Sequence, residues 1–318
     1  MITLTKIAKL AHVSVSTVSK AFSMSNEVNE KTREMIFNVA REHKCFREYF
    51  NAKYPKYVVA IICPEFDSTY YSSTLSLIQM KLAQYNCEIT VASTNFSNDT
   101  ERELIEYYSK YTAVDAIINY GKINQQSVKS EIPIITMGMN DSGKNYVCHD
   151  YEESITKAVK YFISKGKTKI GFIGEELTTG KLYVLCKVAE SLGITIKDEY
   201  ISITKERFEI GGYNGMKKFF ENNNLPDAVV CGYDDVAIGA MRCVKDRNLS
   251  VPEDILIMGM NNIDASAYVI PSLTSITLNN ELTCNSVADM LMARLNGTDY
   301  PDFVVIKSNL LLRESTEI

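Results

Sequence analysis

The sequence predicts an α/β protein with a short helical head at its N-terminus and a long body built on parallel sheets. In the first 40 residues, apolar residues recur at intervals of three and four, the spacing of short amphipathic helices. From residue 58 onward, short apolar runs alternate with amphipathic stretches, the pattern of parallel strands covered by helices on both faces. A chain of 318 residues is also too long for one ordinary core, so we expect two or three folding units.

Three short helices are expected in the head. The first spans about 3–11 with Thr3 as its N-cap, the second begins at Ser14 after a tight connection, and the third begins after Asn29. The buried face of the third helix is expected to contain Met35, Ile36, Val39 and Ala40. Two helices joined by a tight turn predict a helix-turn-helix arrangement, whose second helix enters the major groove of DNA.

The second helix is rich in hydroxyl groups, contributed by Ser14, Ser16, Thr17 and Ser19, and Lys20 follows them. Serine and threonine are poor helix formers, but their hydroxyls suit hydrogen bonds to phosphates and base edges. The same residues also allow a plainer interpretation, in which the hydroxyls only cap the helix and face solvent.

The charge of the chain is unevenly distributed. The net charge is −5, but residues 1–56 carry ten Lys and Arg against five Glu, so this segment has a charge of +5 and the remainder has −10. A basic head on an acidic body is the distribution expected when a phosphate-binding module is joined to an unrelated domain.

The body is expected to contain alternating strands and helices, with ligands binding beyond the carboxyl ends of the strands. Strands are expected at 58–63, 88–92, 114–119, 132–137, 169–173, 228–231 and 255–259, and helices at about 72–85, 100–111, 152–165, 182–192, 212–222, 236–247 and 281–295.

Several features argue against a secreted protein or a metalloprotein. The eight cysteines include no C-x-x-C pair and no histidine at metal spacing, so we expect reduced, buried thiols and neither metal nor cofactor. The amino terminus lacks an apolar signal core, and no 18-residue apolar stretch occurs, so a cytoplasmic protein without membrane contact is expected.

Enzyme signatures are also weak. The segment 170–174 resembles a nucleotide-binding glycine loop but lacks the third glycine and a following lysine. The neighbours Asp234 and Asp235 fit helix capping and dipole complementarity better than acid and base catalysis. The three histidines, at 12, 43 and 149, form no local metal motif. The sequence therefore predicts that the protein is not an enzyme.

An ordered series of motifs runs along almost the whole chain. It begins with the segment 3–20, Thr-Leu-Thr-Lys-Ile-Ala-Lys-Leu-Ala-His-Val-Ser-Val-Ser-Thr-Val-Ser-Lys, and continues with 28–33, 165–174, 235–239, 251–254, 271–276 and 312–316. In this order, the segments resemble the lactose-repressor (LacI/GalR) family of ligand-responsive transcription regulators. One such motif would be weak, but an ordered series is strong.

The resemblance implies a homodimer in which each body is two-lobed, like periplasmic sugar-binding proteins, with an effector bound between the lobes. The head would be 1–45, a hinge linker 46–57 and the body 58–318. The first lobe would be about 58–162 and 278–303, and the second about 163–277 and 304–318.

By family position, three residues of the head would contact base edges and others would contact the DNA backbone. Val15, Ser16 and Lys20 would reach bases, and Ser14, Thr17, Ser19, Ser23 and Thr32 would contact phosphates. Asn29 at the start of the third helix completes the expected DNA-binding set.

The linker departs from the family. The usual Gly-Tyr pair is Lys44-Cys45, the linker is about three residues short, and Pro55 interrupts it. In the family this stretch forms a helix that wedges a leucine into the minor groove. No leucine lies between 44 and 57, so Phe50 or Tyr54 would have to serve as the wedge.

The expected effector site includes an aromatic pair, Tyr70 and Tyr71, which could stack on a ring or could only pack the lobe. Polar contacts are expected from Asn119 and Asp150. At other family positions the usual Arg, Asn and Asp are replaced by Lys181, Tyr233 and Asn261, and the second stacking position falls at Arg207 or Phe208, of which we select Phe208.

These replacements would give the cleft a more positive character, because an acid becomes a neutral amide. They leave two classes of sugar effector open, a neutral sugar or a phosphorylated or acidic one, and also a different ligand or none. The function expected is a DNA-binding transcription regulator, a repressor of operator DNA controlled by a sugar or sugar derivative. The alternatives are a sugar-binding receptor without DNA function and, with less support, a Rossmann-type enzyme.

Overall fold

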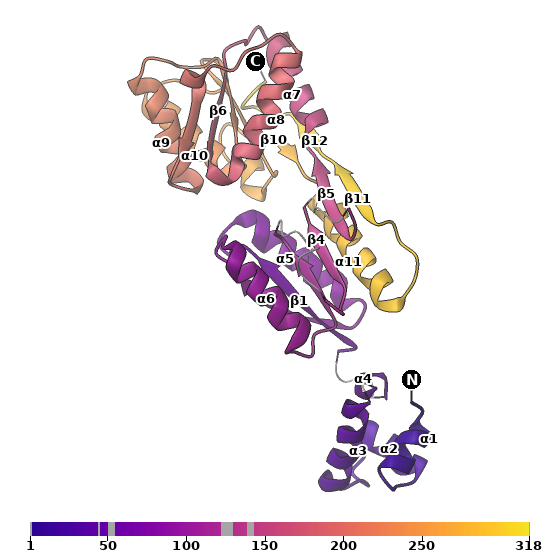
Figure 1. The fold of residues 1–318 in the computed structure, drawn as a ribbon. Coiled ribbons are helices and arrows are strands. Elements are labelled where there is room, and N and C mark those ends of the chain that lie inside the picture. Colours follow the sequence, from indigo (N-terminus) through magenta and orange to yellow (C-terminus); the bar gives the residue numbers. More distant parts are fainter. Residues whose placement is uncertain (1, 44, 50–54, 122–129, 139–142, 318) are drawn as a thin grey trace.

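The computed structural model describes residues 2–43, 45–49, 55–121, 130–138 and 143–317. It consists of a helical head and a body of two stacked α/β lobes, with the head beyond the free end of the first lobe (Figure 1). The α/β class and the parallel sheets expected from the alternating pattern are confirmed.

The head contains four short helices. They are α1 (Leu4–Leu10), α2 (Val15–Phe22), α3 (Glu30–Glu42) and α4 (Phe46–Tyr49). The expected N-caps Thr3 and Asn29 are confirmed, because their side chains accept hydrogen bonds from the backbone of Lys6 and Thr32. Ser14 caps α2 in the same way by accepting from the Thr17 amide. Such caps satisfy backbone donors that the first helical turn leaves free.

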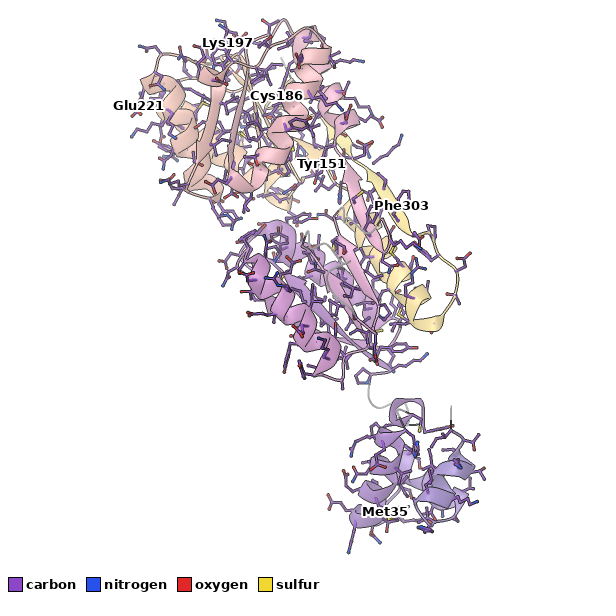
Figure 2. The ribbon with its side chains drawn as sticks, in the orientation of Figure 1. Met35, Tyr151, Cys186, Lys197, Glu221 and Phe303 are labelled. Atoms are coloured by element: carbon purple, nitrogen blue, oxygen red, sulfur yellow. The ribbon has the colours of Figure 1, made fainter. Side chains whose placement is uncertain are left out.

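The core of the head corrects one expectation about α3. Ile36, Phe37 and Ala40 are buried, whereas Met35 is 42% exposed and lies on the outer surface of the head (Figure 2). The phase of the helix explains the difference, since Ala40 follows Ile36 and Phe37 by four and three positions on one face and Met35 lies at its edge.

Helix α4 packs onto the head and does not extend as a linker. The rings of Phe46 and Tyr49 lie 6.0 and 5.7 Å from that of Phe22, and the Tyr49 hydroxyl donates to the carbonyl of Ile2 at 2.7 Å. The head therefore continues to Tyr49, past the expected boundary at 45. The proposed wedge residues Phe50 and Tyr54 lie outside the described residues.

The first lobe has, among its described residues, a six-stranded sheet in the order β11, β5, β4, β3, β1, β2 with all neighbours parallel. Helices α5 and α11 cover one face, and α6 covers the other. The strands are β1 (Tyr57–Cys63), β2 (Cys87–Ser93), β3 (Ala116–Asn119), β4 (Ile134–Met137), β5 (Tyr146–Asp150) and β11 (Phe303–Lys307), and the helices are α5 (Thr69–Ala83), α6 (Asn98–Lys110) and α11 (Asn280–Asn296).

The second lobe repeats this design with the order β12, β10, β9, β8, β6, β7, in which only the β10–β12 pair is antiparallel within the described strands. Helices α9 and α10 cover one face, and α7 and α8 the other. The strands are β6 (Ile170–Glu175), β7 (Ile201–Thr204), β8 (Ala228–Cys231), β9 (Leu256–Met260), β10 (Thr274–Thr277) and β12 (Asn309–Leu311). The α-helices are α7 (Glu152–Ser164), α8 (Thr179–Ser191), α9 (Phe208–Glu221) and α10 (Asp234–Asp246), and short 3-10 helices span Glu176–Thr178, Asp198–Tyr200 and Asp264–Ala267.

The chain passes between the lobes after β5, after β10 and after β11 (Figure 1). Helix α7 packs on α8 and β12, so the first crossing lies near residue 151 and not at the expected 162. Strand β11 pairs with β5, which keeps the first lobe continuous to Lys307 and not only to 303. A hydrogen bond joins the first and third of these crossings, because the Ser308 hydroxyl donates to the carbonyl of Asp150 at 2.6 Å.

Candidate nucleic-acid interface and interlobe site

Helix α2 of the head presents an exposed polar surface, as the sequence predicts for a nucleic-acid interface. Ser16 and Ser19 are exposed, and Val15 is 42% exposed although it lies in an apolar helical spacing. Ser14 and Thr17 have less freedom, because their hydroxyl oxygens are hydrogen-bonded to each other at 2.8 Å. Part of the plainer interpretation therefore also holds, since Ser14 caps the helix.

The lysine of this surface already has a partner in the free protein. Lys20 forms an ion pair with Glu27, and both side chains are largely exposed. Ser23 ends α2 and its hydroxyl donates to the carbonyl of Lys20 at 3.1 Å. The Asn29 side chain caps α3 by accepting from the Thr32 amide at 2.8 Å. An anion approaching this surface would compete with Glu27 for Lys20.

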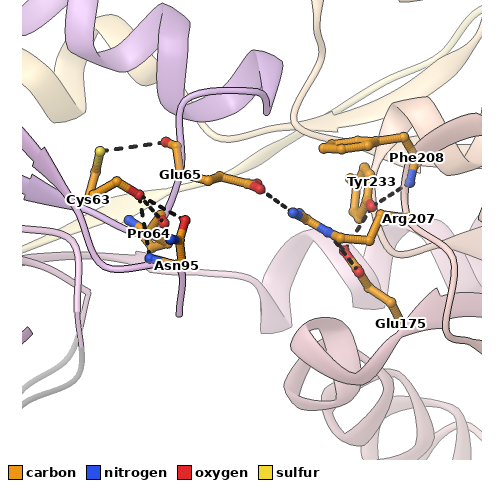
Figure 3. Close-up of polar contacts among 9 residues, drawn as sticks. Cys63, Pro64, Glu65, Asn95, Glu175, Arg207, Phe208 and Tyr233 are labelled. Carbon is orange, nitrogen blue, oxygen red and sulfur yellow. Dashed lines mark hydrogen bonds and ion pairs between the residues drawn. The ribbon is translucent and has the colours of Figure 1, made fainter. Parts of the chain in front are cut away.

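The second candidate site lies between the lobes, where strands from both end. Glu65 follows β1 of the first lobe, Glu175 ends β6 of the second, and Arg207 follows β7. Arg207 joins the two lobes, since one of its terminal nitrogens contacts Glu65 and its Nε is 3.0 Å from Glu175 Oε2 (Figure 3). Both carboxylates are nearly buried, with side chains 11% and 6% exposed.

Burial alone would lower the pKa of Arg207, but hydrogen bonds and charges from Glu65 and Glu175 outweigh it and raise that pKa. The guanidinium also lies near two aromatic rings, 5.1 Å from the centre of Phe96 and 4.6 Å from that of Phe208. Each lobe thus supplies one carboxylate and one ring. Both phenylalanines have positive φ, 61° and 57°, a strained conformation that is concentrated at functional sites.

Tyr233 connects the carboxylate of Glu175 to the backbone amide of Phe208. Its hydroxyl donates to Glu175 Oε1 at 2.8 Å and accepts from the amide of Phe208 at 3.0 Å (Figure 3). Burial is the largest cause that raises the pKa of Tyr233. This expected site residue therefore lies in the cleft, but its hydroxyl positions Glu175 and the turn at Phe208.

Lys181 lies on α8 of the second lobe, and its ammonium donates to the carbonyl of Gly232 at 2.7 Å and lies 5.8 Å from the ring centre of Tyr151. Tyr151 is found where the lobes meet (Figure 2). Burial lowers the pKa of Lys181 to about 8. Burial, aided by the charge of Lys181, lowers the pKa of His149 to about 4.

Tyr70 and Tyr71 start α5 and form an aromatic chain with Tyr120. The ring of Tyr71 is 5.3 Å from that of Tyr70 and 5.6 Å from that of Tyr120, with edge-to-face geometry in both pairs. Burial is the main cause that raises the pKa of both Tyr70 and Tyr71. The two tyrosines therefore pack within the first lobe, while ligand stacking by them stays a prediction.

Two predicted polar contacts have other partners in the structure. Asn119 does end β3, but it is 1% exposed and its amide donates to Glu101 at 2.6 Å. Asp150 ends β5, and its carboxylate accepts from the Glu152 amide at 3.0 Å at the start of α7. Each side chain therefore already has a partner in the protein: Asn119 is bonded to a buried acid, and Asp150 is bonded to the start of the next helix.

Asn261 follows β9 and has a φ of 97°. The loop beyond it is held by Asp234, whose carboxylate accepts from the Ile263 amide at 2.8 Å and from the Ser275 hydroxyl at 2.7 Å. Asp234 does not cap its own helix with its side chain, contrary to expectation. Burial raises its pKa to about 6.

The charged groups at this site include two carboxylates that the sequence did not predict. Two cations, Lys181 and Arg207, are balanced by Glu65 and Glu175, so the described groups show no positive excess. Sequence reasoning missed both acids as site residues. A weak signal existed for Glu65, which lies in the loop that also carries Tyr70.

A third surface is apolar and lies on the second lobe. Two adjoining grooves beside α9 and α10 share Ile238 and Arg242. Ile210 and Ile270 at their edges are 67% and 91% exposed. The two helices approach closely here because Gly239 has no side chain. A Cβ on Gly239 would lie only 1.9 Å from the carbonyl oxygen of Glu209.

The eight cysteines are free, and seven are buried. Over the described ranges, we find no group of three or more His, Cys, Asp or Glu side chains that could hold a metal ion. In the same part of the chain, no helix is both long and apolar enough to span a membrane.

Comparison with protein families matches both parts of the chain. Residues 3–45 match "Bacterial regulatory proteins, lacI family", and residues 159–316 match "Periplasmic binding protein-like domain". Among curated proteins, the HTH-type transcriptional regulator GalR of Streptococcus thermophilus is 28% identical over 341 aligned residues and covers the whole of both chains. Catabolite control protein A of Priestia megaterium is 24% identical and covers 86% of this chain and 87% of its own.

Solved structures show the same fold. The Lac repressor bound to ONPG in the repressed state has a TM-score of 0.77 at 18% identity, covering 99% of both chains. The complex of the transcriptional regulator CelR with cellobiose has a TM-score of 0.71 at 21% identity, covering 99% of this chain and all of the other.

Proposed function

The chain belongs to the lacI family of bacterial regulatory proteins and is a DNA-binding transcription regulator, and from this premise we propose that it is a repressor whose operator affinity is set by a ligand between its lobes. The proposed ligand is a sugar or sugar derivative. The proposed working unit is a homodimer, whose two heads contact two half-sites of one operator.

The proposed DNA contacts are made by α2 and the start of α3. The exposed side chains of Val15 and Ser16, together with Lys20 once it leaves Glu27, are proposed to read base edges. Phosphate contacts are proposed for hydroxyl-bearing residues and the α3 cap, namely Ser14, Thr17, Ser19, Ser23, Asn29 and Thr32.

One observation carries the proposal of a polar ligand. Three buried polar atoms around the cleft have no hydrogen-bond partner among the described residues, namely Glu65 Oε1, His149 Nδ1 and Asn261 Oδ1. Buried polar groups are almost always paired, so unpaired ones in a cleft favour a ligand with hydroxyl groups. CelR, a regulator of the same fold, was solved with cellobiose.

The apolar grooves beside α9 and α10 support the proposal of a homodimer. An exposed apolar surface rimmed by charged residues such as Arg242 and Lys245 is typical of a protein interface. A shared surface on the second lobe would link changes in the cleft to the spacing of the two heads.

A gel-shift experiment with the DNA upstream of the protein's own gene tests the regulator function. We expect a specific complex that weakens when salt rises, because phosphate contacts release counterions. Thermal-shift screening of the same protein against neutral and phosphorylated sugars tests the ligand, since saturation at 100 times the dissociation constant adds about 2.7 kcal/mol. A stabilising sugar without any DNA complex would indicate the alternative of a receptor.

A further inference from the structure

Arg207 occupies the part of the cleft that both lobes share. Its guanidinium contacts Glu65 from the first lobe and Glu175 from the second, and the three side chains come from the segments that follow β1, end β6 and follow β7. Its own side chain is 27% exposed, so the ion pairs are only partly accessible to solvent. A second ion pair between described residues of the two lobes, Lys307 with Glu153, joins exposed side chains, whereas both partners of Arg207 are nearly buried.

The groups around Arg207 are also those that would suit a ring with hydroxyl groups. Carboxylates accept hydrogen bonds from hydroxyls, and aromatic faces stack on the apolar face of a ring. Here Glu65 and Glu175 supply the acceptors, and Phe96 and Phe208 supply the faces. In the structure, the Arg207 guanidinium contacts both of these carboxylates and lies near both of these rings.

We propose that Arg207 is an internal occupant of the cleft, which holds the two lobes together without ligand and must leave Glu65 before the effector binds. This inference deepens the proposed function, because it assigns the regulation of the same cleft to one side chain. Hydroxyl donors of the ligand would replace the N–H groups of Arg207 on Glu65, whose second oxygen is already unpaired among the described residues.

The proposal also restricts the chemistry of the ligand. A phosphorylated or carboxylated sugar would bring a negative charge next to two carboxylates, which would repel it. Its anionic group also has no hydrogen-bond donor for those carboxylates. A neutral ligand with several hydroxyls supplies donors without adding charge. The inference therefore favours the neutral class of the two that the sequence leaves open.

The test uses the full-length protein without ligand or DNA. Hydrogen exchange is followed by mass spectrometry in peptides covering 64–71 and 203–210, and small-angle scattering records the radius of gyration. The variants are Arg207→Gln and Glu65→Gln, with Arg207→Lys as the conservative change. Lys205→Gln is the control, because it removes an exposed cation two residues away.

We expect exchange in both peptides to become roughly tenfold faster in Arg207→Gln and in Glu65→Gln, since local opening sets the exchange rate. The radius of gyration should rise in both. Arg207→Lys should give an intermediate rate, because lysine keeps the charge but not the planar fork. Lys205→Gln should match the wild type.

Unchanged exchange and an unchanged radius in Glu65→Gln, with a wild-type melting curve, would overturn the inference. If Arg207→Gln does not fold, Glu65→Gln alone decides the matter. Because neither DNA nor ligand is present, failure here leaves the proposed regulator function untouched. That function fails separately, by the absence of an operator complex.

Discussion

Lys20 shows how a residue of the proposed DNA surface is restrained in the free protein. Its ion pair with Glu27 joins two largely exposed side chains, so it is weak and easily screened. The pair nevertheless competes with DNA for the same ammonium. Removing the acid should free the lysine without changing the fold of the head.

We predict that Glu27→Gln strengthens operator binding by about threefold at low salt, the scale of one exposed ion pair. Fluorescence anisotropy with labelled operator measures the effect, and raising the salt should reduce it. The control is Glu34→Gln, which removes the partner of Arg41 on α3. Weaker binding by Glu27→Gln would contradict the proposed role of Lys20.

His149 should make the folded protein less stable as the pH falls. Its folded-state pKa of about 4 lies below the ordinary value of 6.5, so the folded protein excludes a proton that the unfolded chain accepts. The stability that this group contributes is therefore complete above pH 6.5 and declines as the pH falls toward 4.

Comparing the wild type with His149→Gln should reveal this contribution. Between pH 7.5 and 4.5 the wild type should lose more stability than the variant, by at most about 3 kcal/mol. Thermal melts at a series of pH values measure the difference. Parallel curves for the two proteins would show that His149 is not protected from protonation in the folded state.

At the residue scale, the sequence predicted what local geometry controls. The N-caps Thr3 and Asn29 depend only on the few residues that follow them, and both were expected. The contact between Arg207 and Glu65 joins residues 142 positions apart, and no local pattern encodes it. For the same reason, the partner of Asn119 was missed.

At the scale of elements, α9 and α10 approach each other closely at two glycines. A Cβ on Gly212 would lie 1.8 Å from the carbonyl of Val236, and one on Gly239 would lie 1.9 Å from that of Glu209. Both obstacles are backbone atoms, so a side chain there forces the helices apart. This contact lies directly under the proposed dimer surface.

We predict that Gly239→Ala destabilises the protein by about 3 kcal/mol, because overpacking displaces a helix. Gly180→Ala in α8 is a matched control, since nothing lies within 4 Å of its Cβ position. There alanine should stabilise by about 0.5 kcal/mol through its better helix propensity. Denaturant unfolding followed by circular dichroism measures both. Equal effects at the two glycines would refute the predicted close packing.

The sequence predicted the long elements better than the short ones. All seven body helices were expected from their periodicity, which extends over several turns. Strands β5, β7, β10, β11 and β12 were not expected. Each has at most five residues, and β7, β11 and β12 also lie at the sheet edges. Helix α4 was read as linker, since four residues give no periodic signal and its burial depends on Phe22 and Phe37.

At the scale of the whole molecule, the apolar grooves of the second lobe and the three crossings between lobes suggest how the parts communicate. The crossings fix the lobes to each other near Asp150 and Ser308, while the cleft lies beside them. A ligand that changes the lobe angle would therefore move the dimer surface relative to the first lobe, which precedes the heads.

We predict that Ile270→Asp yields a monomer, because it places a charge in an apolar interface that must be desolvated. Sedimentation velocity at micromolar concentration measures the change. Tyr183→Asp is the control, since Tyr183 is 71% exposed on α8 and lies outside the grooves. A dimer that persists in Ile270→Asp would place the interface elsewhere.

Specific binding of operator DNA by the head can be measured by fluorescence anisotropy. The DNA comes from upstream of the protein's own gene, scrambled DNA is the competitor, and the wild type is compared with Ser16→Ala/Lys20→Ala. We expect specific, salt-sensitive binding by the wild type, with affinity reduced about tenfold or more in the double variant. Equal affinity for both DNAs, or a double variant that binds like the wild type, would show that α2 does not read an operator.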